Sequence, residues 1–468
     1  MAIQHALDQR VRIKPVFLQL IHSAAYEGPC RVGELESLTP ETDRRRAQEG
    51  FEAFKAAIPE NLTDEAEVLE PAVVQWADDF VVPDAELEAL APDIYGADLV
   101  LVGHTGLPQY PAVKIAERFR TPLAMVGHVS TVDITACLRA QGLEGYAFLD
   151  WEDLNRFLSL LRVRKALQHT RLLIALKGNV VPTGVVSSIA DLEGLKRRYG
   201  VQYELITADE VLDAMRELPE EDARHARELT AELIANAEQS DMDEDQLLPS
   251  VRFYLAACRT LARHEANAFT LPCFEICATQ EMAEERVTFC LAHSLLKDDG
   301  IPSACEGDIN VLMSIAVLMY LSRKTPYMGN TSVADRKHNL IRVGHDVPGL
   351  KMHGFEEPDA PYGIKNFTAG GWGGTLRYDI SRDVGEPVTI ARLNPAGTRL
   401  LVETGEVVDC TGYMDVGCSM AYHIRVDDAE RFFRLEQDFG HHFALVLGNY
   451  LEQLEEFGRL AGFEVVEA

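Results

Sequence analysis

Two acidic side chains, Glu306 and Asp308, lie where carboxylates can do chemistry. An apolar run at 287–296 and a turn at 297–302 precede them, and an apolar segment at 311–321 follows. This order predicts that a strand ends just before the pair and a helix begins just after it. Ligands of open α/β sheets bind at that edge, and a helix N-terminus attracts negative charge. Asp308 is explained equally well as a helix N-cap, whereas burial of Glu306 is costly without a partner.

Two further places offer ligand atoms. Asn330 ends the next predicted strand, and His441 and His442 are adjacent near the C-terminus. A carboxylate with an imidazole suits Mn²⁺, Fe²⁺ or Co²⁺ better than Mg²⁺ alone. Histidine pairs are also common at surfaces and in packing, so the pattern leaves both interpretations open. His345 follows a strand-like stretch and is either a further ligand or substrate contact, or an ordinary loop histidine.

The elements that must position these groups alternate along the chain. Apolar runs typical of strands occur at 13–20, 97–103, 122–126, 171–176, 388–393 and 399–403. Strands that alternate with helices indicate parallel sheets, whereas short runs separated by tight turns indicate antiparallel ones. We therefore predict an α/β fold with two doubly wound parallel-sheet domains, residues 1–168 and 169–350, followed by an antiparallel β-rich domain, residues 351–468. Glu306 and Asp308 fall in the central domain and His442 in the last.

Composition narrows the class of protein. The chain has 468 residues and a formal net charge of −30, which argues against nucleic acid or an anionic membrane as a partner. No uninterrupted apolar stretch of about 18 residues predicts a membrane span, and the N-terminal residues lack the apolar core of a signal peptide. Nine cysteines, without any Cys-x-x-Cys pair, indicate reduced thiols. These features predict a cytoplasmic protein.

Three segments resemble the L-fucose isomerase and L-arabinose isomerase family of ketol isomerases. Residues 305–308 resemble the family's Glu-x-Asp segment that carries a metal ligand, and residues 327–330 fall where the family has its second carboxylate. Residues 440–448 resemble the segment with the metal histidine, in a register that matches His442. The resemblance implies a divalent metal, Mn²⁺ in this family, together with a sugar substrate and a homo-oligomer, either a trimer or a hexamer. It also implies that Glu306, His442 and the residue at position 330 hold the metal.

The chain departs from the family at one of these ligands. Asn330 stands where fucose isomerases have a carboxylate, and an amide does not accept a proton at neutral pH. A ketol isomerase that works through an enediolate needs a base and an acid, so Glu306 or Asp308 is expected to move the proton. The same change suggests a lyase or decarboxylase on a sugar acid as an alternative. A non-catalytic sugar-binding protein is a third possibility, since stacked α/β domains also build sugar receptors.

The remaining candidates are side chains that could contact substrate. His104 and His128 end predicted strands of the first domain, where loop residues often bind ligands. Trp372 is flanked by glycines and could stack on a sugar face or anchor its loop. Asn330 and His345 complete the predicted substrate-binding set. No glycine-rich nucleotide motif follows a strand, so the expected partner is a free sugar or sugar acid rather than a nucleotide.

Overall fold

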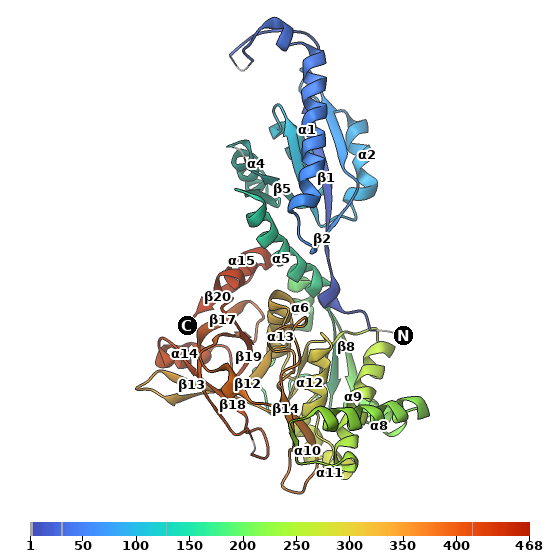
Figure 1. Ribbon diagram of the computed structural model, residues 1–468, viewed down its shortest axis with the longest axis vertical. Helices are drawn as coiled ribbons and strands as arrows, with labels where there is room; N and C mark the ends of the chain where they lie inside the picture. The colour runs from blue at the N-terminus through green and yellow to red at the C-terminus, as the bar shows by residue number, and fades with distance from the viewer. Residues whose placement is uncertain (1–2, 30, 128, 414) are drawn as a thin grey trace. The chain divides into compact units, whose positions relative to one another are not determined.

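The computed structural model describes residues 3–29, 31–127, 129–413 and 415–468. His128 lies outside the described residues. The chain divides into two compact units, Gln9–Lys165 and Met1–Asp8 together with Ala166–Ala468 (Figure 1). Within the described residues no helix is long and apolar enough to cross a membrane.

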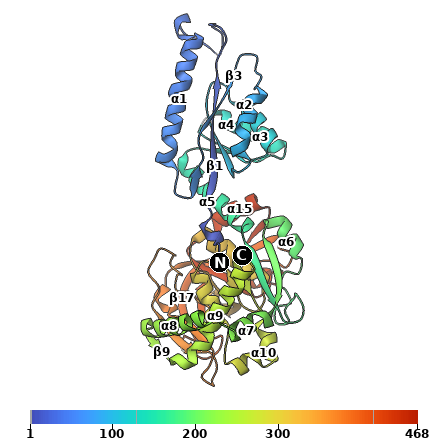
Figure 2. The same ribbon diagram turned by 90° about the vertical axis from the view of Figure 1, so that its right-hand side faces the viewer.

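The smaller unit is a parallel sheet with helices on its faces. Its strands are β1 (Val11–Leu20), β2 (Ala66–Val68), β3 (Ala72–Trp76), β4 (Leu99–Thr105), β5 (Leu123–Val126) and β6 (Gly145–Phe148). They pair in the order β2-β1-β4-β5-β6, with β3 also on β1. The helices are α1 (Pro40–Asn61), α2 (Asp84–Ile94), α3 (Gln109–Phe119), α4 (Val129–Ala140) and α5 (Trp151–Gln168). Figure 2 shows α1 on one side of this sheet and α2 and α3 on the other.

The larger unit begins with a second parallel sheet of the order β11-β10-β7-β8. Its strands are β7 (Arg171–Leu176), β8 (Gln202–Thr207), β10 (Ala268–Thr270) and β11 (Ser303–Ala304). The helices of this part are α6 (Leu192–Tyr199), α7 (Ala208–Arg216), α8 (Glu220–Asn236), α9 (Glu244–Arg263), α10 (Cys273–Ala278), α11 (Glu281–Glu285), α12 (Cys290–Asp298) and α13 (Ile309–Ser322). Leu173 and Phe269 of the sheet pack with α7 and α9 in one buried core. The strands β9 (Gln239–Ser240), β14 (Tyr362–Asn366) and β15 (Gly374–Tyr378) form a small sheet with the pairing order β15-β14-β9, and β15 contacts α9 and α12.

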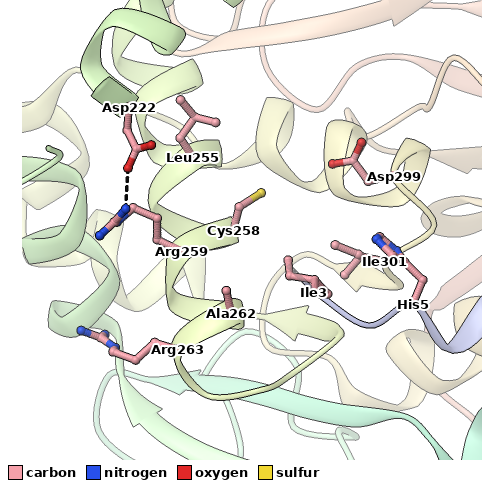
Figure 3. Close-up of a pocket in the computed structure, with 10 residues that line it drawn as sticks. All are labelled: Ile3, His5, Asp222, Leu255, Cys258, Arg259, Ala262, Arg263, Asp299 and Ile301. Carbon is pink, nitrogen blue, oxygen red and sulfur yellow. Dashed lines mark hydrogen bonds and ion pairs between the residues drawn. The ribbon is translucent and has the colours of Figure 1, made fainter. Parts of the chain in front are cut away.

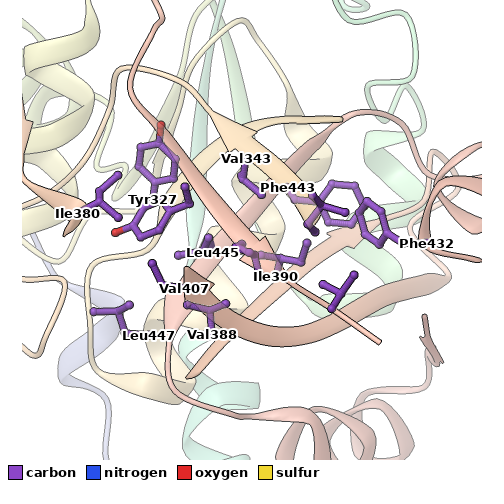
Figure 4. Close-up of a cluster of buried hydrophobic side chains, with 14 of the residues drawn as sticks. Tyr327, Val343, Ile380, Val388, Ile390, Val407, Phe432, Phe443, Leu445 and Leu447 are labelled. Carbon is purple, nitrogen blue, oxygen red and sulfur yellow. The ribbon is translucent and has the colours of Figure 1, made fainter. Parts of the chain in front are cut away.

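An antiparallel barrel completes the larger unit. Its strands are β12 (Tyr327–Asp335), β13 (Leu340–Gly344), β16 (Pro387–Leu393), β17 (Arg399–Thr411), β18 (Ala421–Arg425) and β19 (His442–Leu447). They pair in the order β16-β19-β12-β13-β18-β17, and β17 also pairs with β16, which closes the ring. β20 (Glu464–Glu467) adds to β17 in parallel, and α14 (Ala429–Glu436) and α15 (Leu451–Ala461) flank the barrel strands. Apolar side chains from several strands, among them Ile390 and Leu445, fill a common core (Figure 4).

Helix α13 joins the parallel sheet to the barrel. It contacts β10 and β11 of the sheet and also β16 and β19 of the barrel. Every residue from Ile309 to Tyr320 is buried, which explains why the segment is apolar all round instead of amphipathic. The N-terminus of α13 therefore brings residues from the end of β11 against two barrel strands.

The predicted fold class is confirmed: the chain is α/β, with two parallel sheets followed by a β-rich, antiparallel C-terminal part. One local prediction was wrong. Asn330 does not end a strand of the central parallel sheet, because it is the fourth residue of β12, an antiparallel barrel strand that pairs with β13 and β19. The apolar start of β12 resembles a buried parallel strand, but its partners lie in the barrel and begin before residue 350.

Candidate metal centre

Glu306 sits in a tight turn between β11 and α13. Its φ is +64°, and that of Gly307 is +70°, so two successive residues adopt the left-handed conformation. For a residue with a side chain this conformation costs about 1–2 kcal/mol. Glu306 is also only 6% exposed, although burial of a carboxylate is unfavourable unless it is paired. Backbone strain at a buried charged residue is typical of functional sites.

Asp308 is both a helix cap and an ion-pair partner. Its Oδ1 accepts hydrogen bonds from the backbone N–H of Asn310 at 3.0 Å and of Val311 at 3.2 Å. Its Oδ2 lies 2.7 Å from Nη1 of Arg392 and 3.0 Å from Nδ1 of His442. Both carboxylate oxygens therefore have hydrogen-bond partners. Asp308 caps helix α13 through Oδ1 and contacts Arg392 and His442 through Oδ2.

Arg392 of β16 organises the same region. It is fully buried and donates from Nε to the Phe439 carbonyl at 2.6 Å, from Nη1 to the His442 carbonyl at 2.7 Å, and from Nη2 to Ser187 Oγ at 3.0 Å. Burial by itself raises the pKa of Asp308, but the Arg392 charge and the hydrogen bond from His442 hold this pKa well below its usual range. Sequence reasoning missed Arg392; its signal is an arginine in a strand whose other residues are mostly apolar.

Glu306, His345 and His442 form a buried group of potential metal ligands. Their ligand atoms lie within 4.8 Å of one another. Oε1 of Glu306 is 3.1 Å from Nε2 of His345, and Oε2 is 3.5 Å from Nε2 of His442. Burial raises the pKa of Glu306, but the hydrogen bond from His345 and the charge of that imidazole outweigh burial and lower this pKa. Glu306 is therefore a carboxylate at neutral pH.

The protonation pattern of His442 fits a cation. Because Asp308 is ionised, Nδ1 of His442 donates its proton to that carboxylate, and the lone pair is left on Nε2. That Nε2 is buried and has no hydrogen-bond partner among the described residues. A lone pair that faces the ionised Glu306 at 3.5 Å is repulsive unless a cation or proton lies between them. The donor set of one carboxylate and two imidazoles suits Mn²⁺, Fe²⁺, Co²⁺ or Zn²⁺.

The backbone around His345 and Asn330 brings these residues to the same place. His345 follows β13, and its backbone N–H and carbonyl both contact the hydroxyl group of Tyr327 at 2.6 and 2.8 Å. Asn330 is the antiparallel partner of His442 across β12 and β19, and of Gly344 across β12 and β13. Directly opposed residues in an antiparallel pair project to the same face of the sheet. Asn330 thus projects to the same face of the sheet as His442.

The other sequence candidates lie elsewhere. Trp372 is in the loop between β14 and β15 and packs against the core under the parallel sheet, which includes Ile276 and Met282. His104 belongs to β4 of the smaller unit. His441 is exposed, and its ring lies 4.3 Å from that of His442.

The larger unit also contains a cavity of about 720 Å³, shown in Figure 3. Its lining includes Ile3, His5 and Ile301, with Cys258 and Arg259 from α9. Ile301 precedes β11, so the cavity lies at the amino end of that strand, whereas Glu306 follows the carboxyl end. Ligands of open α/β sheets bind at the carboxyl ends, and the donor atoms gather there, so we take the Glu306 cluster as the functional site.

Comparison with known proteins gives relatives in one activity class. No family model matches the chain. It is 26% identical over 385 residues to the sulfoquinovose isomerase of Priestia aryabhattai and, with the same values, to that of Priestia megaterium. These matches cover 75% of this chain and 81% of each relative. A sulfoquinovose isomerase of Alkalicoccus urumqiensis is 26% identical over 258 residues, which are 50% of this chain and 56% of the relative. The chain is therefore similar to sugar isomerases over most of its length.

Proposed function

We propose that this protein is a divalent-metal-dependent ketol isomerase of a sugar, with Glu306, His345 and His442 as the metal ligands and Asn330 beside them. The observation that carries the proposal is the buried carboxylate of Glu306 facing the unpartnered Nε2 of His442. The similarity to isomerases over 75% of the chain supports the reaction class. A Mn²⁺-type ion at this place would polarise the carbonyl and hydroxyl oxygens of a sugar and acidify the C–H bond between them.

The residues of the chain have separate roles in this proposal. Glu306 takes the proton from C2 of the aldose and returns it to C1 of the enediolate, while the hydroxyl proton of O2 passes to O1, so that one carboxylate serves as base and then as acid. Asp308 positions His442 through Nδ1 and is itself held by Arg392. Because all hydrogen-bonding directions of Asp308 are used inside the protein, it does not reach a substrate proton. Asn330 donates or accepts a hydrogen bond at a substrate hydroxyl group.

The relatives suggest which sugar to test first. They are named for sulfoquinovose, and we propose the same substrate, or a closely similar sugar with an anionic substituent, for this chain. The resemblance to fucose and arabinose isomerases makes the neutral sugars fucose and arabinose the natural comparison. A homo-oligomer in the cytoplasm remains the prediction made from the sequence.

Isotope exchange separates the possible reactions. The protein with Mn²⁺ is incubated in D₂O with sulfoquinovose, glucose, fucose or arabinose, and the recovered sugar is analysed by NMR. Deuterium at C2 without loss of carbon supports the isomerase. Release of CO₂ or a carbon fragment from a sugar acid, without exchange into any aldose, supports the lyase that Asn330 suggests. Sugar binding without exchange, unaffected by a chelator, supports a binding protein.

The variant Glu306→Gln tests the site itself. It should lose turnover completely while its circular dichroism and melting temperature stay close to those of the unaltered protein, because the amide keeps the shape but not the base. Glu403→Gln is a matched control, since Glu403 is also a buried glutamate (4% exposed) but lies in β17 of the barrel. Turnover that survives Glu306→Gln contradicts the assignment of the base.

A further inference from the structure

Two cysteine thiols lie close to the carboxylate of Glu306. Cys273 begins α10 just after β10, and Cys305 follows β11, the neighbouring parallel strand. Their Sγ atoms are 3.7 Å apart, and both lie within 4.8 Å of a carboxylate oxygen of Glu306. Cys305 is buried and Cys273 is partly exposed, so the pair is reachable from one side.

The separation of the two sulfur atoms matches a tetrahedral cation site. With a Zn–S bond of about 2.3 Å and tetrahedral angles, two thiolates on one Zn²⁺ lie roughly 3.8 Å apart. The observed 3.7 Å is close to this value. A disulfide requires about 2.05 Å between the sulfur atoms, so the pair is far from bonded. One carboxylate oxygen with two thiolates is a donor set that selects soft, thiophilic metals over Mn²⁺.

We infer that Cys273, Cys305 and Glu306 form a second cation site, specific for a thiophilic divalent ion such as Zn²⁺. Binding exchanges the two thiol protons for two metal–sulfur bonds and releases two protons to solvent. Three protein ligands leave the fourth tetrahedral position to water. The proposal stands on the arrangement of the three side chains and does not require that the protein be an isomerase.

The shared ligand gives this site a consequence for the proposed function. Both oxygens of Glu306 face the imidazoles of His345 and His442, at 3.1 and 3.5 Å. A cation between the thiols draws one of these oxygens away from the imidazoles and removes the proposed base from its position. Zn²⁺ should therefore inhibit the enzyme. This second part rests on the proposed function, whereas the existence of the thiolate site does not.

Cobalt absorption tests the thiolate site without any turnover. The reduced, chelator-treated full chain is titrated with Co²⁺, which gives intense sulfur-to-cobalt charge-transfer absorption in the near ultraviolet only when thiolates are ligands. We expect this band in the unaltered protein, its loss in Cys273→Ser and in Cys305→Ser, and its bleaching by one equivalent of Zn²⁺. Cys277→Ser is the control, because Cys277 lies in the same helix but is exposed and outside the group.

The outcomes separate the two parts of the inference. Absence of the band in the unaltered protein, or its persistence in Cys273→Ser and Cys305→Ser, overturns the site. If Cys305→Ser does not fold, the partly exposed Cys273 still decides the matter. In the isomerase assay with Mn²⁺, the Zn²⁺ concentration for half inhibition should rise at least tenfold in Cys273→Ser relative to Cys277→Ser. If the cobalt band is present but the Zn²⁺ concentration for half inhibition is unchanged, the inhibitory role alone is overturned. If the protein has no isomerase activity, the proposed function is contradicted, whereas the cobalt result still tests the thiolate site.

Discussion

The substitution Asp308→Asn separates the positioning role of this residue from its role as a helix cap. Asn caps a helix about as well as Asp, so the bonds from Asn310 and Val311 can be kept by the amide oxygen. The amide NH₂ then faces Arg392 and Nδ1 of His442, where the structure has an oxygen that accepts from both. His442 must accept at Nδ1 and carry its proton on Nε2, which removes the lone pair from the metal side.

The expected size of the effect follows from these contacts. Loss of the partner that orients a metal-binding histidine typically costs 10- to 100-fold in metal affinity, or about 1.4–2.7 kcal/mol. Stability also falls, because removal of one partner from a buried ion pair costs about 3–5 kcal/mol. Arg392 keeps its bonds to Phe439, His442 and Ser187, so we expect a loss near the lower end, about 3 kcal/mol.

The assay is a calorimetric titration of the metal-free protein with Mn²⁺, together with urea unfolding of the same samples. Asp243→Asn is the matched control. Asp243 is the exposed N-cap of α9, and its side chain accepts from the Gln246 N–H within a capping box, but no histidine depends on it. We expect Asp243→Asn to bind Mn²⁺ normally and to unfold within about 0.5 kcal/mol of the unaltered protein. Equal Mn²⁺ affinity in the two variants refutes the argument that Asp308 orients His442.

Three other substitutions test the placement of Asn330, the protonation of Glu403 and the turn at Gly307. Asn330→Asp places a second carboxylate on the sheet face that carries His442. This variant should bind Mn²⁺ about tenfold more tightly or better, because negative ligands strengthen the binding of hard cations. A calorimetric Kd no lower than that of the unaltered protein contradicts this placement. Burial raises the pKa of Glu403 from 4.5 to about 8, so the folded state binds an extra proton between these values and stability should fall as pH rises from about 4.5 to 8. Thermal melts of Glu403→Gln should lose this slope, and an unchanged slope excludes Glu403 as its source. Gly307→Ala, at a φ of +70°, should destabilise the turn by about 1–2 kcal/mol in urea unfolding, and no loss would show that the turn relaxes.

Local sequence patterns were enough to predict the parallel sheets, the β-rich C-terminal part and the placement of Glu306 and Asp308 between a strand and a helix. These features depend on residues near in sequence: the short strand β11, the turn with Glu306 and Gly307, and the apolar helix α13. The register of β12 was not accessible in this way, because its apolar start suits a parallel strand and an antiparallel barrel strand equally. Its partners, β13 and β19, are decided by pairing over long distances.

The sequence by itself determined which side chains were available for chemistry, since carboxylates, imidazoles and thiols are visible as letters. Only the tertiary structure decided which of these side chains contact one another. Asp308 and His442 are 134 residues apart, and they meet because α13 is buried between the parallel sheet and the barrel. The same packing directs Asp308 toward Arg392 and leaves the carboxylate of Glu306 close to two imidazoles and to two thiols. Such contacts depend on the registers of β16 and β19, which no local pattern encodes.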